Sequence, residues 1–135
     1  MILKTYTRIF TTDIASTVAT LQAVHGTQPH LNLTYDPLTL VGIGDVLVIG
    51  GTDEALAPIR GSLGPWIVED IDDARSKLLA NGAAVIRDIV DIPTGRMMYM
   101  KHADGSTVEY VQWAPELVER HIFAPLRAGT PASQI

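Results

Sequence analysis

The chain of 135 residues contains no cysteine, which excludes disulfide bonds, thiolate chemistry and cysteine-ligated zinc sites. It also has no cluster of basic residues, since 10 Lys and Arg stand against 15 Asp and Glu and give a formal net charge of −5. An acidic chain without a basic patch is poorly suited to bind nucleic acid or an anionic membrane surface. We therefore expect no nucleic-acid partner and no membrane partner.

Long hydrophobic runs are absent as well. The apolar stretch at residues 38–51 is interrupted by Asp45 and is shorter than the roughly 20 residues that a membrane-spanning helix needs. The first residues, MILKTYTR, contain no apolar signal-peptide segment. The sequence therefore predicts a soluble, cytoplasmic protein.

The chain does contain 47% hydrophobic residues, which is enough to build a core. Its length is typical of one compact domain or of two small fused halves. We expect a single domain over residues 1–127. The small and polar residues at 128–135 predict a flexible tail.

Turn residues and side-chain periodicity divide the chain into two similar halves. The first half is expected to contain a strand at 3–11, a helix at 14–25, and strands at 30–35, 38–43 and 46–49. The second half is expected to contain a strand at 66–69, a helix at 71–81, strands at 84–92, 97–102 and 107–113, and a short helix at 115–123. The glycine-rich segment at 50–64 is expected to connect the halves.

The halves also share residues at matching places. Asp13-Ile14 recurs as Asp70-Ile71, with each Asp expected to be a helix N-cap, and Leu21 recurs as Leu78 at the same offset. On the second helix, Ile71, Leu78 and Leu79 are expected on the apolar face. A repeated unit of one strand, one helix and three strands predicts a fold that is built from two similar modules. A ferredoxin-like ACT or dimeric-barrel fold is the alternative, and it requires βαββαβ order.

Residues 95–113, GRMMYMKHADGSTVEYVQW, predict a β-hairpin with its turn at 103–106. A four-residue loop would pair His102 with Thr107 and place Met100 opposite Glu109. Strand alternation places Glu109 on one side of the second strand, among apolar neighbours. A lone carboxylate there needs a metal, a cation, a hydrogen-bond donor or water as its partner. The alternative is a Glu on a solvated face.

Several of these segments resemble the vicinal oxygen chelate superfamily, which includes glyoxalase I, bleomycin-resistance proteins and extradiol dioxygenases. The resemblance rests on VEDIDDA at 68–74, Pro93-x-Gly95, Asp104-Gly105-x-x-x-Glu109 and Phe10-x-x-Asp13-Ile14. It implies an α+β, glyoxalase-like fold, in which two βαβββ modules at 3–50 and 64–113 form a curled mixed sheet around a cleft. It also implies a homodimer.

In the enzymes of this superfamily a divalent metal is bound in the cleft by His and Glu residues from the first and last strands of each module. Glu109 matches one such position. The equivalent positions elsewhere fall on Val48, on Tyr6 or Thr7, and on Leu63 or Gly64, none of which is His or Glu. One matched ligand of four is too few for a tight site. A divalent metal would therefore need ligands from other residues, such as His30 or His102.

The resemblance and the hairpin together make Glu109 and His102 the candidate catalytic residues. If the two share a side of the hairpin, they form a pair that can bind metal or transfer protons. The alternative is that His102 is a polar residue at a solvated turn.

Candidate substrate-binding residues come from both halves. Tyr6 and Arg8 share a face of the first strand, where Arg8 can pair with Glu109 or hold an anionic substrate, unless that face is solvated. Four further residues are expected to form an apolar pocket wall, with plain core packing as the alternative: Trp66, Met98, Met100 and Trp113.

Three functions remain open from the sequence, each with a small, largely apolar organic molecule as partner. The first is a metal-independent isomerase or lyase that uses Glu109 as acid or base. The second is a non-catalytic protein that sequesters an antibiotic or a metabolite, as the bleomycin-resistance branch does. The third is a divalent-metal-dependent lyase or dioxygenase with atypical ligands.

Overall fold

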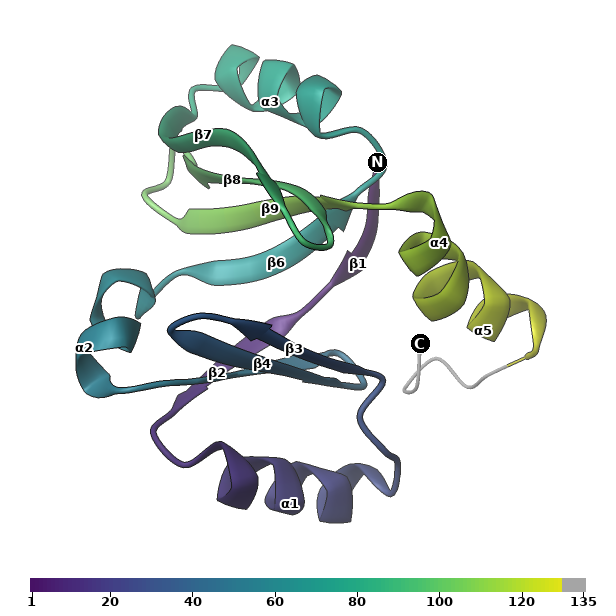
Figure 1. Cartoon of the computed structure of the whole chain (residues 1–135). Helices are drawn as coiled ribbons and strands as arrows, with labels where there is room; N and C mark the ends of the chain where they lie inside the picture. The colour runs from purple at the N-terminus through teal and green to yellow at the C-terminus, as the bar shows by residue number, and fades with distance from the viewer. Residues whose placement is uncertain (130–135) are drawn as a thin grey trace. The chain divides into compact units, whose positions relative to one another are not determined.

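The computed structural model describes residues 1–129, which divide into two compact units (Figure 1). One unit consists of residues 1–5 and 61–129, and the other of residues 6–60. Of the predicted tail, residues 130–135 lie outside the described residues. None of the helices within residues 1–129 has the length and hydrophobicity needed to cross a lipid bilayer.

The unit of residues 6–60 is a four-stranded sheet with one long helix on a face. Its elements are β2 (Thr7–Thr11), α1 (Ile14–His25), β3 (Leu31–Tyr35), β4 (Leu38–Ile43), β5 (Val46–Gly50), α2 (Asp53–Leu56) and the 3₁₀ turn η1 (Ala57–Ile59). The strand order is β2-β5-β4-β3, in which β2 and β5 are parallel and the other pairs are antiparallel.

The other unit is a five-stranded sheet with α3 on one face. Its elements are β1 (Ile2–Thr5), β6 (Leu63–Val68), α3 (Ile71–Ala80), β7 (Ala84–Ile92), β8 (Gly95–Lys101), β9 (Thr107–Trp113), α4 (Pro115–Val118), the π-helix η2 (Glu119–Phe123) and α5 (Ala124–Arg127). The strand order is β1-β6-β9-β8-β7, with β6 and β9 parallel.

The two units repeat one arrangement. In each, a strand is followed by a helix and three strands, and the first strand pairs in parallel with the last, as β2 does with β5 and β6 with β9. This confirms the predicted α+β fold of two βαβββ modules. The βαββαβ alternative is wrong, because three strands follow each helix. The strands form two sheets rather than one continuous sheet.

The predicted helix ends are confirmed by their hydrogen bonds. The Asp13 carboxylate accepts a bond of 3.1 Å from the backbone N–H of Ser16, and the Asp70 carboxylate accepts one of 3.1 Å from Asp73. These bonds satisfy N–H groups that a helix leaves without partners in its first turn. Gly26 ends α1 in the left-handed conformation, with φ of 69°.

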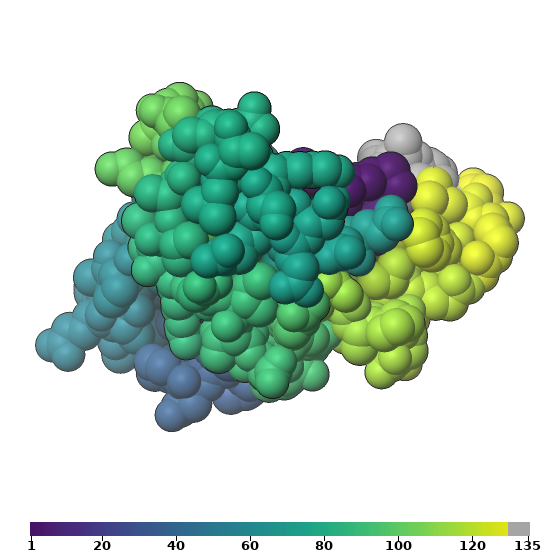
Figure 2. Space-filling model, turned by 90° about the horizontal axis from the view of Figure 1, so that it is seen from above, coloured from purple at the N-terminus to yellow at the C-terminus, as the bar shows by residue number. Residues whose placement is uncertain are grey.

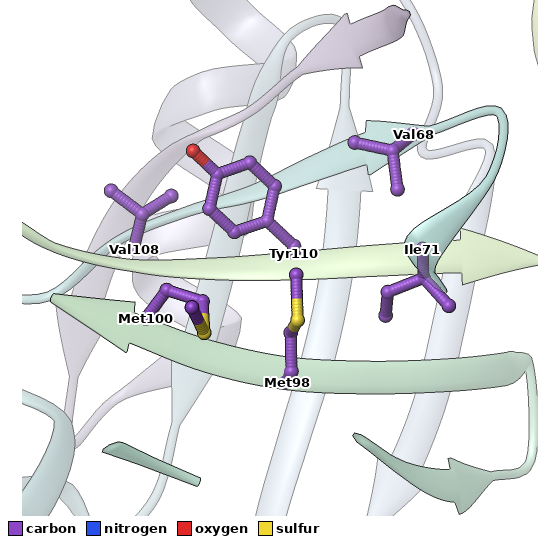
Figure 3. Packing of buried hydrophobic residues seen from close by; sticks show 6 residues of the cluster. All are labelled: Val68, Ile71, Met98, Met100, Val108 and Tyr110. Carbon is purple, nitrogen blue, oxygen red and sulfur yellow. The ribbon is translucent and has the colours of Figure 1, made fainter. Parts of the chain in front are cut away.

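The two long helices, α1 and α3, each cover one face of the sheet in their own unit. On α1, Ile14, Val18 and Leu21 pack against buried Val41, Ile43 and Val48. The second core contains six buried residues, against which Ala74 and Leu78 of α3 pack. Figure 3 shows the side chains of the six residues gathered together: Val68, Ile71, Met98, Met100, Val108 and Tyr110. The prediction for Leu79 is wrong, because its side chain is 41% exposed, whereas neighbouring Leu78 packs against this core.

Three predicted elements differ in the structure. The single strand predicted at 3–11 is two strands, since β1 pairs with β6 in one sheet while β2 pairs with β5 in the other, and Tyr6 lies between them. The predicted connector at 50–64 contains α2, which Thr52 caps by accepting a bond of 3.1 Å from Ala55 N–H. The predicted C-terminal helix extends beyond 123 to Arg127.

Candidate functional site

The register of the β8–β9 hairpin decides which side chains lie near Glu109. Tyr99 pairs with Glu109 and Lys101 with Thr107, so the predicted pairing of His102 with Thr107 is wrong by one residue. The loop therefore has five residues, 102–106, instead of four, and within it the His102 N–H donates a bond of 2.8 Å to the Ser106 carbonyl oxygen. A one-residue slip exchanges the faces of a strand. Met100 therefore lies opposite Val108 rather than Glu109.

Glu109 lies on the sheet face that α3 does not cover, because its neighbours Val108 and Tyr110 belong to the core beneath α3. On the same face, Val111 and Trp113 are buried, and Ile67 pairs with Val111 from β6. The Glu109 side chain is half-buried. The hairpin therefore presents one carboxylate on a face that also carries these apolar side chains and the buried Lys4, which pairs with Ile67 from β1.

His102 belongs to the opposite face. Its Nε2 lies 2.6 Å from the hydroxyl of Tyr110, and the two rings stack with centroids 5.9 Å apart. Trp66 meets both rings edge-on, at 5.9 Å from His102 and 5.6 Å from Tyr110. Burial raises the pKa of Tyr110 to about 12, so its hydroxyl stays protonated and can donate a hydrogen bond to Nε2 of His102. The expected His102–Glu109 pair is not formed.

Two members of the expected apolar pocket wall lie in the core instead. Met98 and Met100 are 0% exposed and lie in one cluster with Val108 and Tyr110 (Figure 3), against which α3 packs. Plain core packing, which was the alternative for the pocket wall, therefore accounts for Met98 and Met100. Trp66 packs against the same core, whereas Trp113 lies on the other face with its ring 5.8 Å from that of His121.

Tyr6 and Arg8 belong to the unit of residues 6–60. Arg8 pairs with Leu47, and Leu47 pairs with Gly42. Leu47 alternates along β5 with Val48, which packs against α1, so Leu47 and Arg8 lie on the sheet face that α1 does not cover. Tyr6 is 3% exposed, and its hydroxyl lies 2.7 Å from Nε2 of His30. The Tyr6 and His30 rings stack at 6.0 Å.

The sequence did not predict that His30 is the hydrogen-bond partner of Tyr6. A Cβ on Gly42 would lie 3.1 Å from the His30 Nε2, so glycine leaves room for the imidazole. Burial, together with the charge of Asp45, raises the pKa of Tyr6 well above its ordinary value, so its hydroxyl stays protonated. The signal was a glycine inside a predicted strand, which often marks a close approach of another group.

The residues at the metal positions of the superfamily do not form a metal site. Asp13 and Asp70 cap equivalent helices, and counting back from them makes Ile9 equivalent to Trp66. Ile9 pairs with Val48 and Trp66 with Tyr110, so the residue equivalent to Glu109 is Leu47 rather than Val48. Leucine cannot ligate a metal. Across residues 1–129 no three His, Asp or Glu side chains lie close enough to hold an ion.

Sequence comparison alone finds little. No protein-family model matches the chain. No curated protein matches it by sequence either.

Solved structures do match. An uncharacterized protein from Methanosarcina mazei is 30% identical, with a TM-score of 0.77, and the match covers 84% of this chain and 94% of that one. Methylmalonyl-CoA epimerase from Mycobacterium tuberculosis is 17% identical with a TM-score of 0.65, covering 87% and 92% of the two chains. The Streptomyces coelicolor epimerase in complex with 2-nitronate-propionyl-CoA is 17% identical with a TM-score of 0.63, covering 84% and 99%.

Proposed function

We propose that this member of the vicinal oxygen chelate superfamily, which belongs to the family of the Methanosarcina mazei protein, binds a small, largely apolar carbonyl compound. In the proposed reaction a proton is transferred between this compound and the carboxylate of Glu109. The observation that carries the proposal is the half-buried carboxylate of Glu109 on the sheet face that α3 leaves uncovered. A positioned carboxylate in partly apolar surroundings is suited to general acid–base catalysis.

The structural neighbours support this type of chemistry. Both epimerases among them are named for methylmalonyl-CoA, and the Streptomyces coelicolor enzyme was solved with 2-nitronate-propionyl-CoA. Inverting a carbon next to a carbonyl group requires that a proton is removed and then returned. In the proposed step the C–H bond breaks, the proton binds a Glu109 carboxylate oxygen, and the electron pair moves to the carbonyl oxygen. Return of the proton to carbon restores the carboxylate.

The proposed reaction does not use a metal, because the residues present do not fit one. Glu109 has Leu47 at the equivalent place of the other module, and His102 is bonded to Tyr110 on the opposite sheet face. The substrate-binding role expected of Arg8, which belongs to the other unit, stays a prediction.

The proposal is tested by proton exchange. The parent protein is incubated in D₂O with a set of small carbonyl compounds that includes methylmalonyl-CoA, and loss of the proton next to the carbonyl is followed by NMR. We expect Glu109→Gln to lower the exchange rate by roughly 100-fold or more, in line with the loss of a general base. Binding of the compound should be retained.

Glu116→Gln is the matched control, because Glu116 is an exposed glutamate of the same unit outside the hairpin. Its exchange rate should equal that of the parent. If Glu109→Gln exchanges as fast as the parent, the assignment of Glu109 as base is wrong. Tight binding without exchange by the parent protein would instead favour a sequestering function.

A further inference from the structure

A cavity of about 520 Å³ lies within the unit of residues 1–5 and 61–129, where β1 meets the C-terminal helical segment. In Figure 2 the first residues, in purple, lie beside the yellow C-terminal segment, with the teal residues that follow β6 on their other side. A volume of this size falls within the range typical of small-molecule sites, roughly 300–1,000 Å³. Glu109 does not line this cavity, so the site is distinct from the proposed catalytic one.

Most of the cavity wall is apolar. Leu3, Val68 and Trp113 contribute to it from the sheet, and Val118 and Phe123 contribute from the C-terminal segment. Trp113 supplies the largest side chain, and its ring is held in place on one side by an edge contact of 5.8 Å with His121. Such a wall suits the aromatic or branched aliphatic part of a ligand.

The backbone beside the cavity has an uncommon conformation. Residues Glu119–Phe123 form a π-helix, and both its first and its last residue line the cavity. π-Helical turns are rare and occur frequently at functional sites. This observation is independent of the cavity's size and points to the same place.

Gln112 supplies an oriented hydrogen-bond donor. Its Oε1 accepts a bond of 2.9 Å from the Ile71 N–H and one of 3.3 Å from the Arg96 guanidinium. Arg96 is itself held by Asp72 through a contact of 2.9 Å. These bonds use the oxygen end of the Gln112 amide, so its Nε2 end remains to donate to a group in the cavity that Gln112 lines.

The charged side chains that line the cavity are both carboxylates, Glu69 and Glu119. Glu119 is paired with Arg127, whereas Glu69 lies exposed at the end of β6. Because the charge of Glu119 is offset by Arg127, Glu69 is the carboxylate that attracts cations and repels anions at this cavity. Glu69 therefore favours a cationic ligand.

We propose that this cavity binds a small organic amine that carries an apolar body and an oxygen acceptor. The body packs against Trp113 and its apolar neighbours, the acceptor oxygen receives a hydrogen bond from Gln112 Nε2, and the ammonium group is directed toward Glu69. Three probes with one common side chain test this ligand class: phenylalaninamide as the cation, N-acetylphenylalaninamide as the neutral form and N-acetylphenylalanine as the anion.

Each probe is titrated into the full chain at about pH 6, where an α-amino group is charged, and binding is followed by NMR. We expect the cation to bind most tightly and the anion most weakly. The largest changes in NMR chemical shift should occur at the Trp113 indole N–H and the Val118 methyl groups. Equal affinities, an anion preference, or shifts centred elsewhere would overturn the proposal.

Three variants sharpen the test. Glu69→Gln should weaken the cation about fivefold and leave the neutral probe unchanged, as expected for one exposed charge pair. Glu116→Gln, at an exposed glutamate outside the cavity lining, should change neither. Val118→Trp should fill the cavity and weaken all three probes.

Val118→Trp can also disturb folding, so the NMR resonances of the β8–β9 hairpin in this variant are compared with those of the parent. If these resonances differ, the proposal is judged from Glu69→Gln alone. Cavity resonances that shift with protein concentration instead of with probe would show that a second copy of the chain occupies this surface. That result would overturn the proposal as well.

Discussion

Among single residues, the two glycines of the β8–β9 hairpin, Gly95 and Gly105, have positive φ angles for different reasons. Gly95 has φ of 150°, and a Cβ there would overlap the carbonyl oxygen of Gln112 on the adjacent strand. Gly105 has φ of 96°, but a Cβ there would meet nothing within 4 Å. Gly95 is therefore required by space and by backbone conformation, whereas Gly105 is required by conformation alone.

We predict that Gly95→Ala lowers the free energy of unfolding by about 3 kcal/mol or more, since it adds a clash with backbone to an unfavourable φ. Gly105→Ala should cost only about 1 kcal/mol, from the φ angle. Urea unfolding of the two variants and the parent measures the difference. Equal losses would show that β8 and β9 separate at Gly95 without cost.

His121 provides a pH-dependent contribution. Burial, followed by the charges of Arg120 and Lys4, lowers the pKa of His121 below its ordinary value. The unfolded chain therefore binds a proton at this residue more readily than the folded chain, and stability must fall as the pH drops through the ordinary value of about 6.5. Above that pH the residue is neutral in both states and contributes no pH dependence.

We predict that the free energy of unfolding of the parent decreases between about pH 7.5 and about pH 5.5 by more than that of His121→Gln, which has no titrating group at this position. Urea unfolding at several pH values measures both curves. Parallel curves for the two proteins would contradict the assignment of this pH dependence to His121.

At the scale of elements, the packing of α3 on its sheet depends on the hairpin register. With Met98 opposite Tyr110 and Met100 opposite Val108, both methionines face α3 and are fully buried. Gln112 adds a polar contact, since its Oε1 accepts the N–H of Ile71 in the first turn of α3. The hairpin thus supplies both the apolar surface and one hydrogen-bond acceptor to the helix.

We predict that Met98→Ala lowers the free energy of unfolding by about 2–5 kcal/mol, because it leaves a cavity in this core. Leu79→Ala on α3 removes a side chain that is 41% exposed and should cost about 1 kcal/mol or less. Chemical denaturation of the two variants tests the difference. A comparable loss for Leu79→Ala would mean that the outer face of α3 is also packed.

At the scale of the whole molecule, two copies of one βαβββ arrangement carry different polar groups. In one unit Glu109 lies on the sheet face that α3 does not cover. In the other unit Arg8 lies on the sheet face that α1 does not cover, and the buried Tyr6 contacts His30. Leu47 occupies the place equivalent to Glu109. The duplicated fold is therefore kept while the residues for metal binding are not. The homodimer and the cytoplasmic location stay predictions.

We predict that neither EDTA nor an added divalent ion such as Mn²⁺ or Zn²⁺ changes the thermal midpoint of unfolding by more than about 1 °C. An ion that binds the folded state would raise the midpoint in proportion to its occupancy of the site. Differential scanning fluorimetry measures the midpoints. A rise of several degrees with one ion would show that ligands other than the matched positions assemble a metal site.

The sequence by itself determined the features that depend on neighbouring residues. Asp13 and Asp70 identified two helix starts, because an N-cap bond reaches only three residues along the chain. Gly26 identified one helix end, and the order of one strand, one helix and three strands, found twice, predicted the fold. Glu109 was singled out by its residue type and by its place after the turn, and its catalytic role stays a prediction.

The tertiary structure decided what depends on pairing between distant segments. It divided the stretch at 3–11 between two sheets at Tyr6, set the hairpin loop at five residues, and brought His30 to Tyr6 from 24 residues away. Strand side chains alternate, so a slip of one residue in the loop was enough to transfer His102 to the face opposite Glu109. Local sequence determines which residues form a strand, but only the hydrogen bonds to its neighbours determine which face each side chain occupies.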